Sequence, residues 1–222
     1  MQVYTIAQRA EGIRRRIAEA CEKAGRPPED VTIVAVSKTF PPSAIREAFL
    51  AGFQHIGENR VQEAEEKVPE LRDLDIVWHM VGHLQSNKVK KALDIFNIIQ
   101  SVDSLHLAEE ISRRAQKTIP VLLEVNIGQE ESKFGLTPEV ALRESGRFAN
   151  LPHLELRGLM TVAPICQDPE EVRPIFRRLR ELRDTLGLRE LSMGMTDDFP
   201  VAIEEGATIV RIGRAIFGER TI

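Results

Sequence analysis

The sequence predicts an α/β protein built as a single (β/α)8 TIM barrel with an extra N-terminal helix. Three observations predict this fold. Eight β-rich stretches alternate with helical segments along the 222 residues, and several of them are nearly unbroken apolar runs, as in parallel strands covered on both faces. Polar and glycine-rich residues collect where the stretches end, which is typical of the C-terminal face of such a barrel. An open doubly wound sheet is the alternative, although such sheets usually have fewer strands.

The first element is an amphipathic helix between residues 1 and 25. Its apolar residues recur at steps of three and four (Val3, Ile6, Ala10, Ile13, Ile17, Ala20), and Gly25-Arg26-Pro27-Pro28 closes it. The eight expected strands cover residues 31–37, 53–57, 76–81, 95–101, 119–126, 154–161, 190–194 and 208–212. No linker, low-complexity tract or repeat divides the chain, so we expect one domain over residues 1–222.

Helical signals fill the segments between these strands. Ser43 stands ahead of an apolar-periodic stretch, and Thr137-Pro138-Glu139 reads as an N-cap and first turn. A later helix is marked by an apolar stripe: Val172, Ile175, Leu179, Leu182, Leu186. Pro174 fits badly inside that helix, because proline lacks the N–H and clashes one turn back. We therefore expect a kink or a later start there.

Composition narrows the classes of protein. The formal charge is −4, with 42% hydrophobic and 29% charged residues, as in a soluble globular protein with no basic face for nucleic acid. No apolar run approaches the ~20 residues of a membrane span, and the first residues lack the features of a secretory signal. We expect a cytoplasmic protein with small-molecule partners. Cys21 and Cys166 belong to no CxxC pair, so we interpret them as reduced thiols without a role.

The loops after the seventh and eighth expected strands suit a phosphate group. Gly194 and Gly213 permit close backbone approach, Thr196 adds a hydroxyl, and Thr196 and Arg214 lie where short helical stretches begin. Barrels often bind phosphate with these two loops. The alternative is that Thr196 caps its own helix and the glycines serve tight turns.

Lys38 directly follows the first expected strand. A lysine there would point into the barrel mouth, and partial burial would lower the pKa of its amine and favour Schiff-base chemistry. The alternative, which composition alone favours, is a surface lysine at the start of a loop.

Arg211 lies within the apolar eighth strand, where a permanent charge needs a partner. It either pairs with an interior carboxylate or donates to a bound ring nitrogen or phosphate.

His79 and His83 lie near the end of the third strand. Without a further ligand signature we interpret them as core or rim histidines and expect no metal site.

A set of motifs gives the chain a family resemblance over nearly its whole length. The motifs are Val34-Ala35-Val36-Ser37-Lys38, Gly57-Glu58-Asn59-Arg60-Val61-Gln62-Glu63, Trp78-His79-Met80-Val81-Gly82-His83-Leu84-Gln85-Ser86-Asn87-Lys88, Ser101-Val102-Asp103, Lys133-Phe134-Gly135, Arg157-Gly158-Leu159-Met160, Ser192-Met193-Gly194-Met195-Thr196 and Arg211-Ile212-Gly213. With these motifs in this order, the chain resembles the pyridoxal phosphate (PLP) homeostasis proteins. These are relatives of the N-terminal barrel of alanine racemase.

The resemblance implies a PLP fold type III barrel without the racemase's C-terminal β-domain. It implies an internal aldimine on Lys38, Asn59 beside the cofactor ring, and Arg211 facing the pyridine nitrogen. It also puts the phosphate among Thr196, Gly213 and Arg214. The full candidate cofactor-binding set is Lys38, Asn59, Met193, Gly194, Thr196, Arg211, Gly213 and Arg214. Many relatives have Ser at position 196, and Thr or Ser at position 214, so the Arg214 backbone N–H is the expected contact.

The resemblance further implies a carrier that holds PLP and passes it on, with PLP-dependent enzymes as transient acceptors and no catalytic residue. Alanine racemase uses a lysine and a tyrosine as its two bases, and the only tyrosine here, Tyr4, is far in sequence from every expected site loop. A PLP-dependent amino-acid racemase with Lys38 as base, and His83 or water opposite, is one alternative. A cofactor-free Schiff-base aldolase is another. The missing β-domain makes a monomer the expected state.

Overall fold

The computed structural model describes residues 4–128, 130 and 134–219, and its core is a closed barrel of eight parallel strands. The strands are β1 (Thr32–Val36), β2 (His55–Glu58), β3 (Val77–Met80), β4 (Ile98–Val102), β5 (Ile119–Glu124), β6 (Leu154–Met160), β7 (Glu190–Ser192) and β8 (Ile209–Ile212). They follow one another around the barrel in chain order, and β1 pairs with both β2 and β8. This closure confirms the predicted barrel and excludes the open sheet. Each predicted strand is present, with bounds that differ by a few residues.

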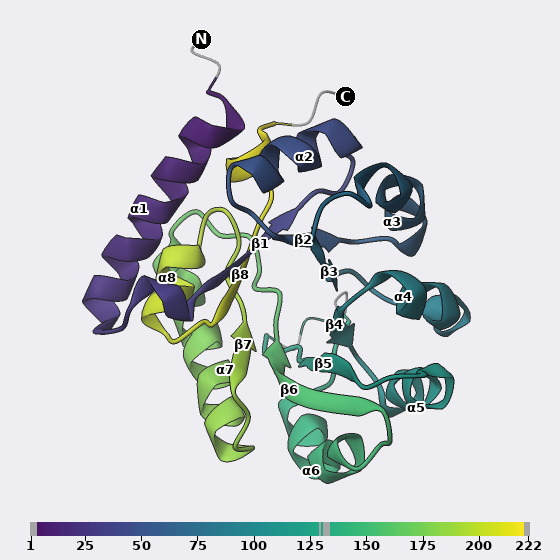
Figure 1. The fold of residues 1–222 in the computed structure, drawn as a ribbon. Coiled ribbons are helices and arrows are strands. Elements are labelled where there is room, and N and C mark those ends of the chain that lie inside the picture. The colour runs from purple at the N-terminus through teal and green to yellow at the C-terminus, as the bar shows by residue number, and fades with distance from the viewer. Residues whose placement is uncertain (1–3, 129, 131–133, 220–222) are drawn as a thin grey trace.

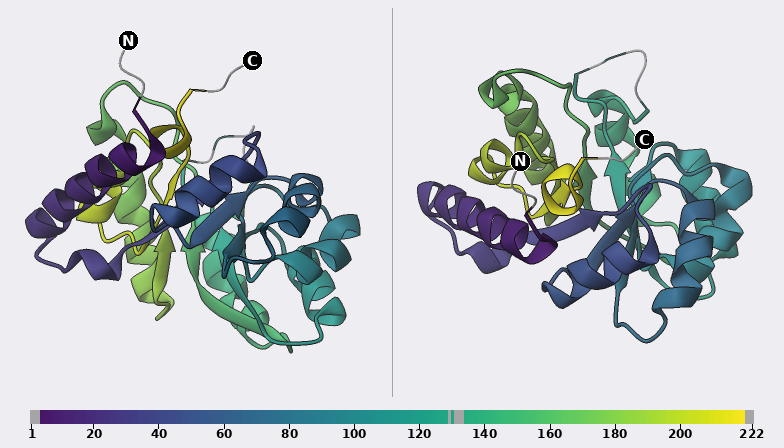
Figure 2. Two further views of the ribbon diagram at one scale, coloured as in Figure 1. Left: turned by 45° about the horizontal axis from the view of Figure 1, so that its top comes forward. Right: turned by 90° about the horizontal axis from the view of Figure 1, so that it is seen from above.

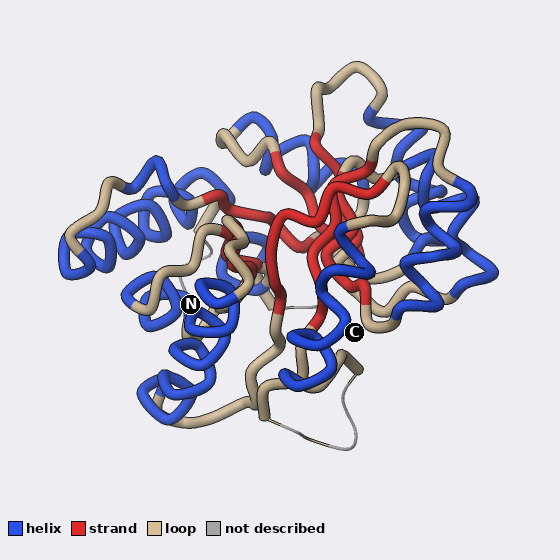
Figure 3. Tube along the Cα trace, turned by 90° about the horizontal axis from the view of Figure 1, so that it is seen from below, coloured by secondary structure: helices blue, strands red, loops and turns tan. Residues whose placement is uncertain are grey.

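Helices surround the strands on the outside (Figures 1 and 3). In the described part of the chain they are α1 (Ile6–Ala24), α2 (Pro42–Leu50), α3 (Val61–Lys67), α4 (Val89–Ile95), α5 (Leu105–Arg114), α6 (Pro138–Ala149), α7 (Arg173–Thr185), α8 (Phe199–Glu204) and α9 (Arg214–Phe217). Four short 3-10 turns accompany them: η1 (Pro28–Asp30), η2 (Val68–Leu71), η3 (Ser86–Lys88) and η4 (Pro169–Val172). No helix among the described residues has both the length and the apolar character needed to cross a membrane.

The extra N-terminal helix is α1, as predicted. Thr5 and Gln8 form a capping box at its start, and Gly25 ends it with φ +65°, a left-handed conformation that glycine adopts without strain. Its apolar stripe is buried, while Val3 lies outside the described residues. The helix lies beside α8 on the outside of the molecule (Figures 1 and 2).

Proline positions decide where two helices begin. α2 begins at Pro42, after an N-cap at Pro41, so Ser43 lies inside the first turn and our expectation that it precedes the helix is wrong. α7 begins at Arg173, which puts Pro174 in its first turn, and η4 precedes it. A proline in the first turn costs nothing, because the N–H it lacks has no partner in the helix. Of the two outcomes expected here, a kink or a later start, the structure shows the later start.

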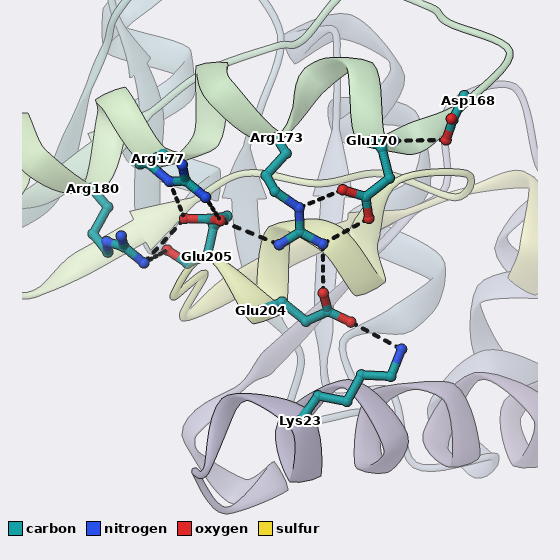
Figure 4. A network of polar contacts seen from close by, with 8 residues as sticks. All are labelled: Lys23, Asp168, Glu170, Arg173, Arg177, Arg180, Glu204 and Glu205. Atoms are coloured by element: carbon teal, nitrogen blue, oxygen red, sulfur yellow. Dashed lines mark hydrogen bonds and ion pairs between the residues drawn. The ribbon is translucent and has the colours of Figure 1, made fainter.

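A network of ion pairs connects three of the helices that surround the barrel (Figure 4). The Arg173 guanidinium contacts Glu204 at 2.6 Å and Glu205 at 3.2 Å, and Lys23 of α1 contacts Glu204 at 3.2 Å. Arg177 and Arg180 of α7 also pair with Glu205, whose side chain is only 5% exposed. The network joins α1, α7 and α8, and α8 leads directly into β8.

Apolar packing is divided between two regions. The larger cluster includes residues of the helices and of the strand faces turned toward them. A second, separate cluster consists of Val34, Leu122, Met160 and Ile209, from β1, β5, β6 and β8. Because side chains of strands that are not neighbours meet there, this cluster lies in the barrel interior.

Candidate cofactor site

The predicted site residues lie at the C-terminal ends of β7, β8, β1 and β2, which are consecutive strands of the closed barrel. Met193 and Gly194 are buried, Arg214 is exposed, and Lys38, Asn59, Thr196 and Gly213 are half-buried. Arg211 is buried within β8. The fold therefore brings all eight to one end of the barrel.

A buried ion pair fixes the backbone around Lys38. Glu58, at the end of β2, accepts a hydrogen bond from the Ser37 hydroxyl at 2.6 Å and another from the Lys67 ammonium at 2.7 Å. Lys67 also donates to the Ser37 carbonyl at 2.9 Å. On the other side of Lys38, Thr39 has φ +69° and donates its N–H to Glu63 at 2.9 Å. Lys38 is therefore half-buried and lies on a turn held by hydrogen bonds on both sides. A lysine that was only a surface residue would need no such support.

Burial is the main influence on Glu58. It raises the pKa of this carboxyl, while the Lys67 ammonium and the Ser37 hydroxyl oppose the rise. One oxygen, Oε2, is buried without a hydrogen-bond partner. The carboxylate thus depends on Lys67 for its charge compensation.

The loops after β7 and β8 meet. The Thr196 hydroxyl accepts a hydrogen bond from the Ala215 backbone N–H at 3.4 Å, so it reaches α9 and does not merely cap the helix that follows it. Arg214 pairs with Asp197 at 2.6 Å across the same junction. The two loops in which the sequence predicts a phosphate site are therefore in direct contact.

Two glycines allow the close packing of these loops. Gly194 has φ +90°, and a Cβ there would lie 2.5 Å from the Cβ of Ala202. A Cβ on Gly213 would lie 3.3 Å from the Val36 carbonyl oxygen, on the strand that leads to Lys38. Gly194 therefore lets the β7 loop pack against α8, and Gly213 lets the β8 loop pack against the end of β1, next to Lys38.

Arg211 points into the barrel and is held by neutral oxygens. Its guanidinium donates to the Ser192 hydroxyl at 2.6 Å and to the Thr161 carbonyl at 2.8 Å. Burial lowers its pKa to about 10, and the nearby Glu124 opposes that shift, so the group stays charged at neutral pH. A guanidinium has five N–H donors. These two bonds therefore orient Arg211 and leave it with donor capacity for a ligand.

Glu124 is a charged group that the sequence reasoning missed. It is the last residue of β5 and is 9% exposed. Burial raises its pKa to about 7. The charge of Arg211 lowers the pKa of Glu124, and the charge of Asp103 raises it. Glu124 could have been found by the argument applied to Arg211, because it too interrupts an apolar strand. Glu58 and Lys67 were also missed as a pair, since their partnership depends on the fold.

The histidines at the third strand have separate environments. His79 is inside the barrel, whereas His83 stacks on Phe134 with ring centroids 3.9 Å apart and hydrogen-bonds Asp103 at 2.9 Å. Lys133, next to Phe134 in the motif that supports the resemblance, lies outside the described residues. Within the described residues no group of three or more His, Cys, Asp or Glu side chains could hold a metal ion.

A cavity of about 640 Å³ opens beside Asn59, at the ends of β2 and β3. Asn59, Gly82, His83 and Lys88 are among its lining residues. Gly82 has no room for a side chain, because a Cβ would lie 2.3 Å from the Asn59 carbonyl oxygen. The close approach of the two loops is therefore what positions Asn59.

The residues present fit a phosphorylated aldehyde with a ring nitrogen. An amine lies on an anchored turn, a buried guanidinium has unused N–H donors, and two glycine-containing loops meet at the same end of the barrel. These features together define a barrel suited to a pyridine cofactor.

Comparisons with known proteins agree with this geometry. The family model for the N-terminal domain of alanine racemase matches residues 9–221. The chain is 49% identical to the pyridoxal phosphate homeostasis protein of Aquifex aeolicus, over 96% of this chain and 97% of that protein. It is 39% identical to the Escherichia coli K12 protein of the same name, over 97% of each.

Solved structures show the same likeness. PipY of Synechococcus elongatus PCC7942, solved with PLP bound, is 39% identical and superposes with a TM-score of 0.85, over 96% of this chain and all of PipY. Alanine racemase from Corynebacterium glutamicum is 19% identical, with a TM-score of 0.67 over 93% of this chain and 60% of the racemase. The second likeness shows the fold alone.

Fold and site together define a barrel of the alanine racemase N-terminal type. More particularly, the chain belongs to the family of pyridoxal phosphate homeostasis proteins.

Proposed function

We propose that this protein binds PLP covalently, as a Schiff base on Lys38, and holds it for the control of intracellular PLP. The observation that carries the proposal is the meeting of Lys38, Arg211 and the two glycine loops at one end of the barrel. PipY, 39% identical over nearly the whole chain, was solved with PLP bound, which supports this assignment.

Each candidate residue has a proposed task. Lys38 provides the amine, Asn59 lies beside the ring, and Met193 and Gly194 form the wall next to β8. Arg211 donates to the ring nitrogen. The phosphate is held by the Thr196 hydroxyl and by the backbone of Gly213 and Arg214. The Arg214 guanidinium is already paired with Asp197, which is why we assign the contact to its N–H.

With Arg211 at the ring nitrogen, the bound cofactor would be a weaker electron sink. PLP supplies an electron sink that is strongest when its ring nitrogen carries a proton, and a guanidinium does not readily give one up. Tyr4 is 53% exposed and precedes α1 on the outside of the barrel. His83 is engaged by Phe134 and Asp103. We therefore propose that the protein has no robust catalytic activity and no catalytic residue.

Absorption spectroscopy tests the binding proposal. Purified protein with added PLP should show a Schiff-base band near the visible edge, and Lys38→Ala should abolish it. Lys90→Ala, which removes an exposed lysine, is the matched control and should keep the band. A wild-type protein that stays colourless with PLP would refute covalent binding, and it would leave a cofactor-free aldolase in its place.

Exchange of the α-hydrogen tests the absence of catalysis. A panel of amino acids is incubated with the loaded protein in deuterated water. We expect no stereoinverting turnover above background. Turnover that is lost in Lys38→Ala would identify a racemase and contradict the carrier proposal.

We further propose that residues 1–222 work as one cytoplasmic cofactor-binding domain, as a monomer that passes PLP to PLP-dependent enzymes. The continuous barrel over the described residues supports a single unit. Light scattering coupled to size-exclusion chromatography should give the mass of one chain, 25.0 kDa. A mass of two chains would contradict the monomer.

A further inference from the structure

A row of polar side chains, buried except for the half-buried His55, crosses the barrel interior beneath the proposed ring site. From Arg211 on β8 the contacts run to Ser192 on β7, to Gln100 on β4, to His79 on β3 and to His55 at the start of β2. The distances are 2.6, 2.6, 2.8 and 2.9 Å in that order. Because β4 and β7 are not neighbours in the sheet, the contact between Gln100 and Ser192 must span the inside of the barrel.

With the Gln100 amide as placed, one consistent set of donors and acceptors runs from Arg211 along this row. A guanidinium only donates, so the Ser192 oxygen accepts from it, and the single Ser192 hydrogen goes to Gln100 Oε1. The Gln100 amide then turns its Nε2 to His79 and donates to Nδ1. His79 must therefore carry its proton on Nε2, from which it donates to His55 Nδ1. One proton serves each contact, and no donor faces a donor.

The protonation of the imidazoles agrees with this direction. Burial and, to a smaller extent, the adjacent His55 lower the pKa of His79 to about 3. Burial also lowers the pKa of His55. Both rings are therefore neutral at neutral pH, as a row of single-proton bonds requires.

We propose that Ser192, Gln100 and His79 are positioning residues for Arg211, which together aim its guanidinium at the ring nitrogen of the cofactor. The inference rests on the proposed function and deepens it. Arg211 would otherwise have one fixed contact, the Thr161 carbonyl, and could swing about it. The row adds a second contact, the Ser192 hydroxyl, which is oriented in turn by the buried side chains of Gln100 and His79.

Two serines on the barrel strands provide a matched test. Ser192→Ala removes a hydroxyl from the row, and Ser101→Ala removes a hydroxyl from a fully buried serine of β4 that has no hydrogen-bond partner. Hydrogen bonds to charged groups have energies that correspond to roughly ten- to a hundredfold in binding. We expect Ser192→Ala to bind PLP weaker by about that factor and to shift the absorption maximum of the bound cofactor. Ser101→Ala should change neither.

A second measurement needs no variant and no cofactor. Nitrogen-15 NMR of histidine-labelled protein reports the tautomer of each of the five imidazoles. We expect His79 to be neutral with its proton on Nε2. If Ser192→Ala and Ser101→Ala bind PLP equally and give one absorption maximum, or if His79 carries its proton on Nδ1, the proposal is overturned. Failure of wild-type protein to bind PLP would instead refute the proposed function, and the His79 tautomer would still test the row.

Discussion

Replacing Lys67 with methionine is the sharpest test of how the turn that carries Lys38 is held. The substitution removes the ammonium that contacts Glu58 at 2.7 Å and the Ser37 carbonyl at 2.9 Å, while methionine keeps most of the apolar stem. The Lys67 and Glu58 side chains are 9% and 0% exposed, so water cannot replace the lost partner. Breaking a buried pair in this way typically costs about 3–5 kcal/mol.

The response of Glu58 limits the cost and makes it depend on pH. Without Lys67, burial raises the pKa of Glu58 further, and the folded protein takes up a proton there. At pH 7, which is 2.5 pH units above the ordinary carboxyl pKa of 4.5, protonating the group costs a free energy of about 3.4 kcal/mol. At pH 5 the same step costs 0.5 unit, about 0.7 kcal/mol. Because burial already raises the pKa of Glu58 in the wild type, the destabilisation should be smaller at pH 5 than at pH 7 by up to about 3 kcal/mol.

Urea unfolding of the cofactor-free protein at both pH values measures this difference. Lys91→Met, which breaks an exposed ion pair with Glu65, is the matched control and should change stability by less than about 1 kcal/mol. Adding Glu58→Gln to Lys67→Met should restore much of the stability at pH 7. A loss below about 1 kcal/mol for Lys67→Met, or an equal loss at both pH values, would refute this account of the turn.

Three further predictions concern other parts of the molecule. Burial raises the pKa of Glu124 to about 7, so its contribution to stability is full below pH 4.5 and is lost as the pH rises through 7. Glu124→Gln removes this dependence, and its stability relative to wild type should rise by up to about 3 kcal/mol between pH 5 and pH 8 in urea unfolding. Gly194→Ala should cost about 1–3 kcal/mol in the same assay, because φ is +90° and the new Cβ would lie 2.5 Å from the Cβ of Ala202; wild-type stability would contradict this. Glu205→Gln weakens the pairing of α7 with α8 through Arg173 (Figure 4) and should cost about 1–2 kcal/mol with unchanged PLP affinity, whereas a selective loss of affinity would contradict its structural role.

The sequence allowed the barrel to be predicted because its signals are local. Apolar runs marked the strands, and polar residues after them marked the C-terminal face, where Lys38 and Arg211 indeed lie. Boundaries were less certain. The start of α2 was misplaced at Ser43 because proline at the first helical position was not weighed as a start signal.

The contacts that organise the site could not be predicted in this way. Ser192 and Gln100 are 92 residues apart, and only the closure of the barrel brings them together. The pairing of Glu58 with Lys67 likewise depends on how α3 packs behind β2. The roles of Asn59 and Arg211 came from the family resemblance, since the residues alone left alternatives open.

Chemical trapping of the cofactor tests the central claim most directly. Protein loaded with PLP is reduced with borohydride, which converts a Schiff base into a stable secondary amine, and is then digested and analysed by mass spectrometry. We predict one phosphopyridoxyl group on the peptide that contains Lys38, and none in Lys38→Ala. An unmodified Lys38, or a label on another lysine, would contradict the account.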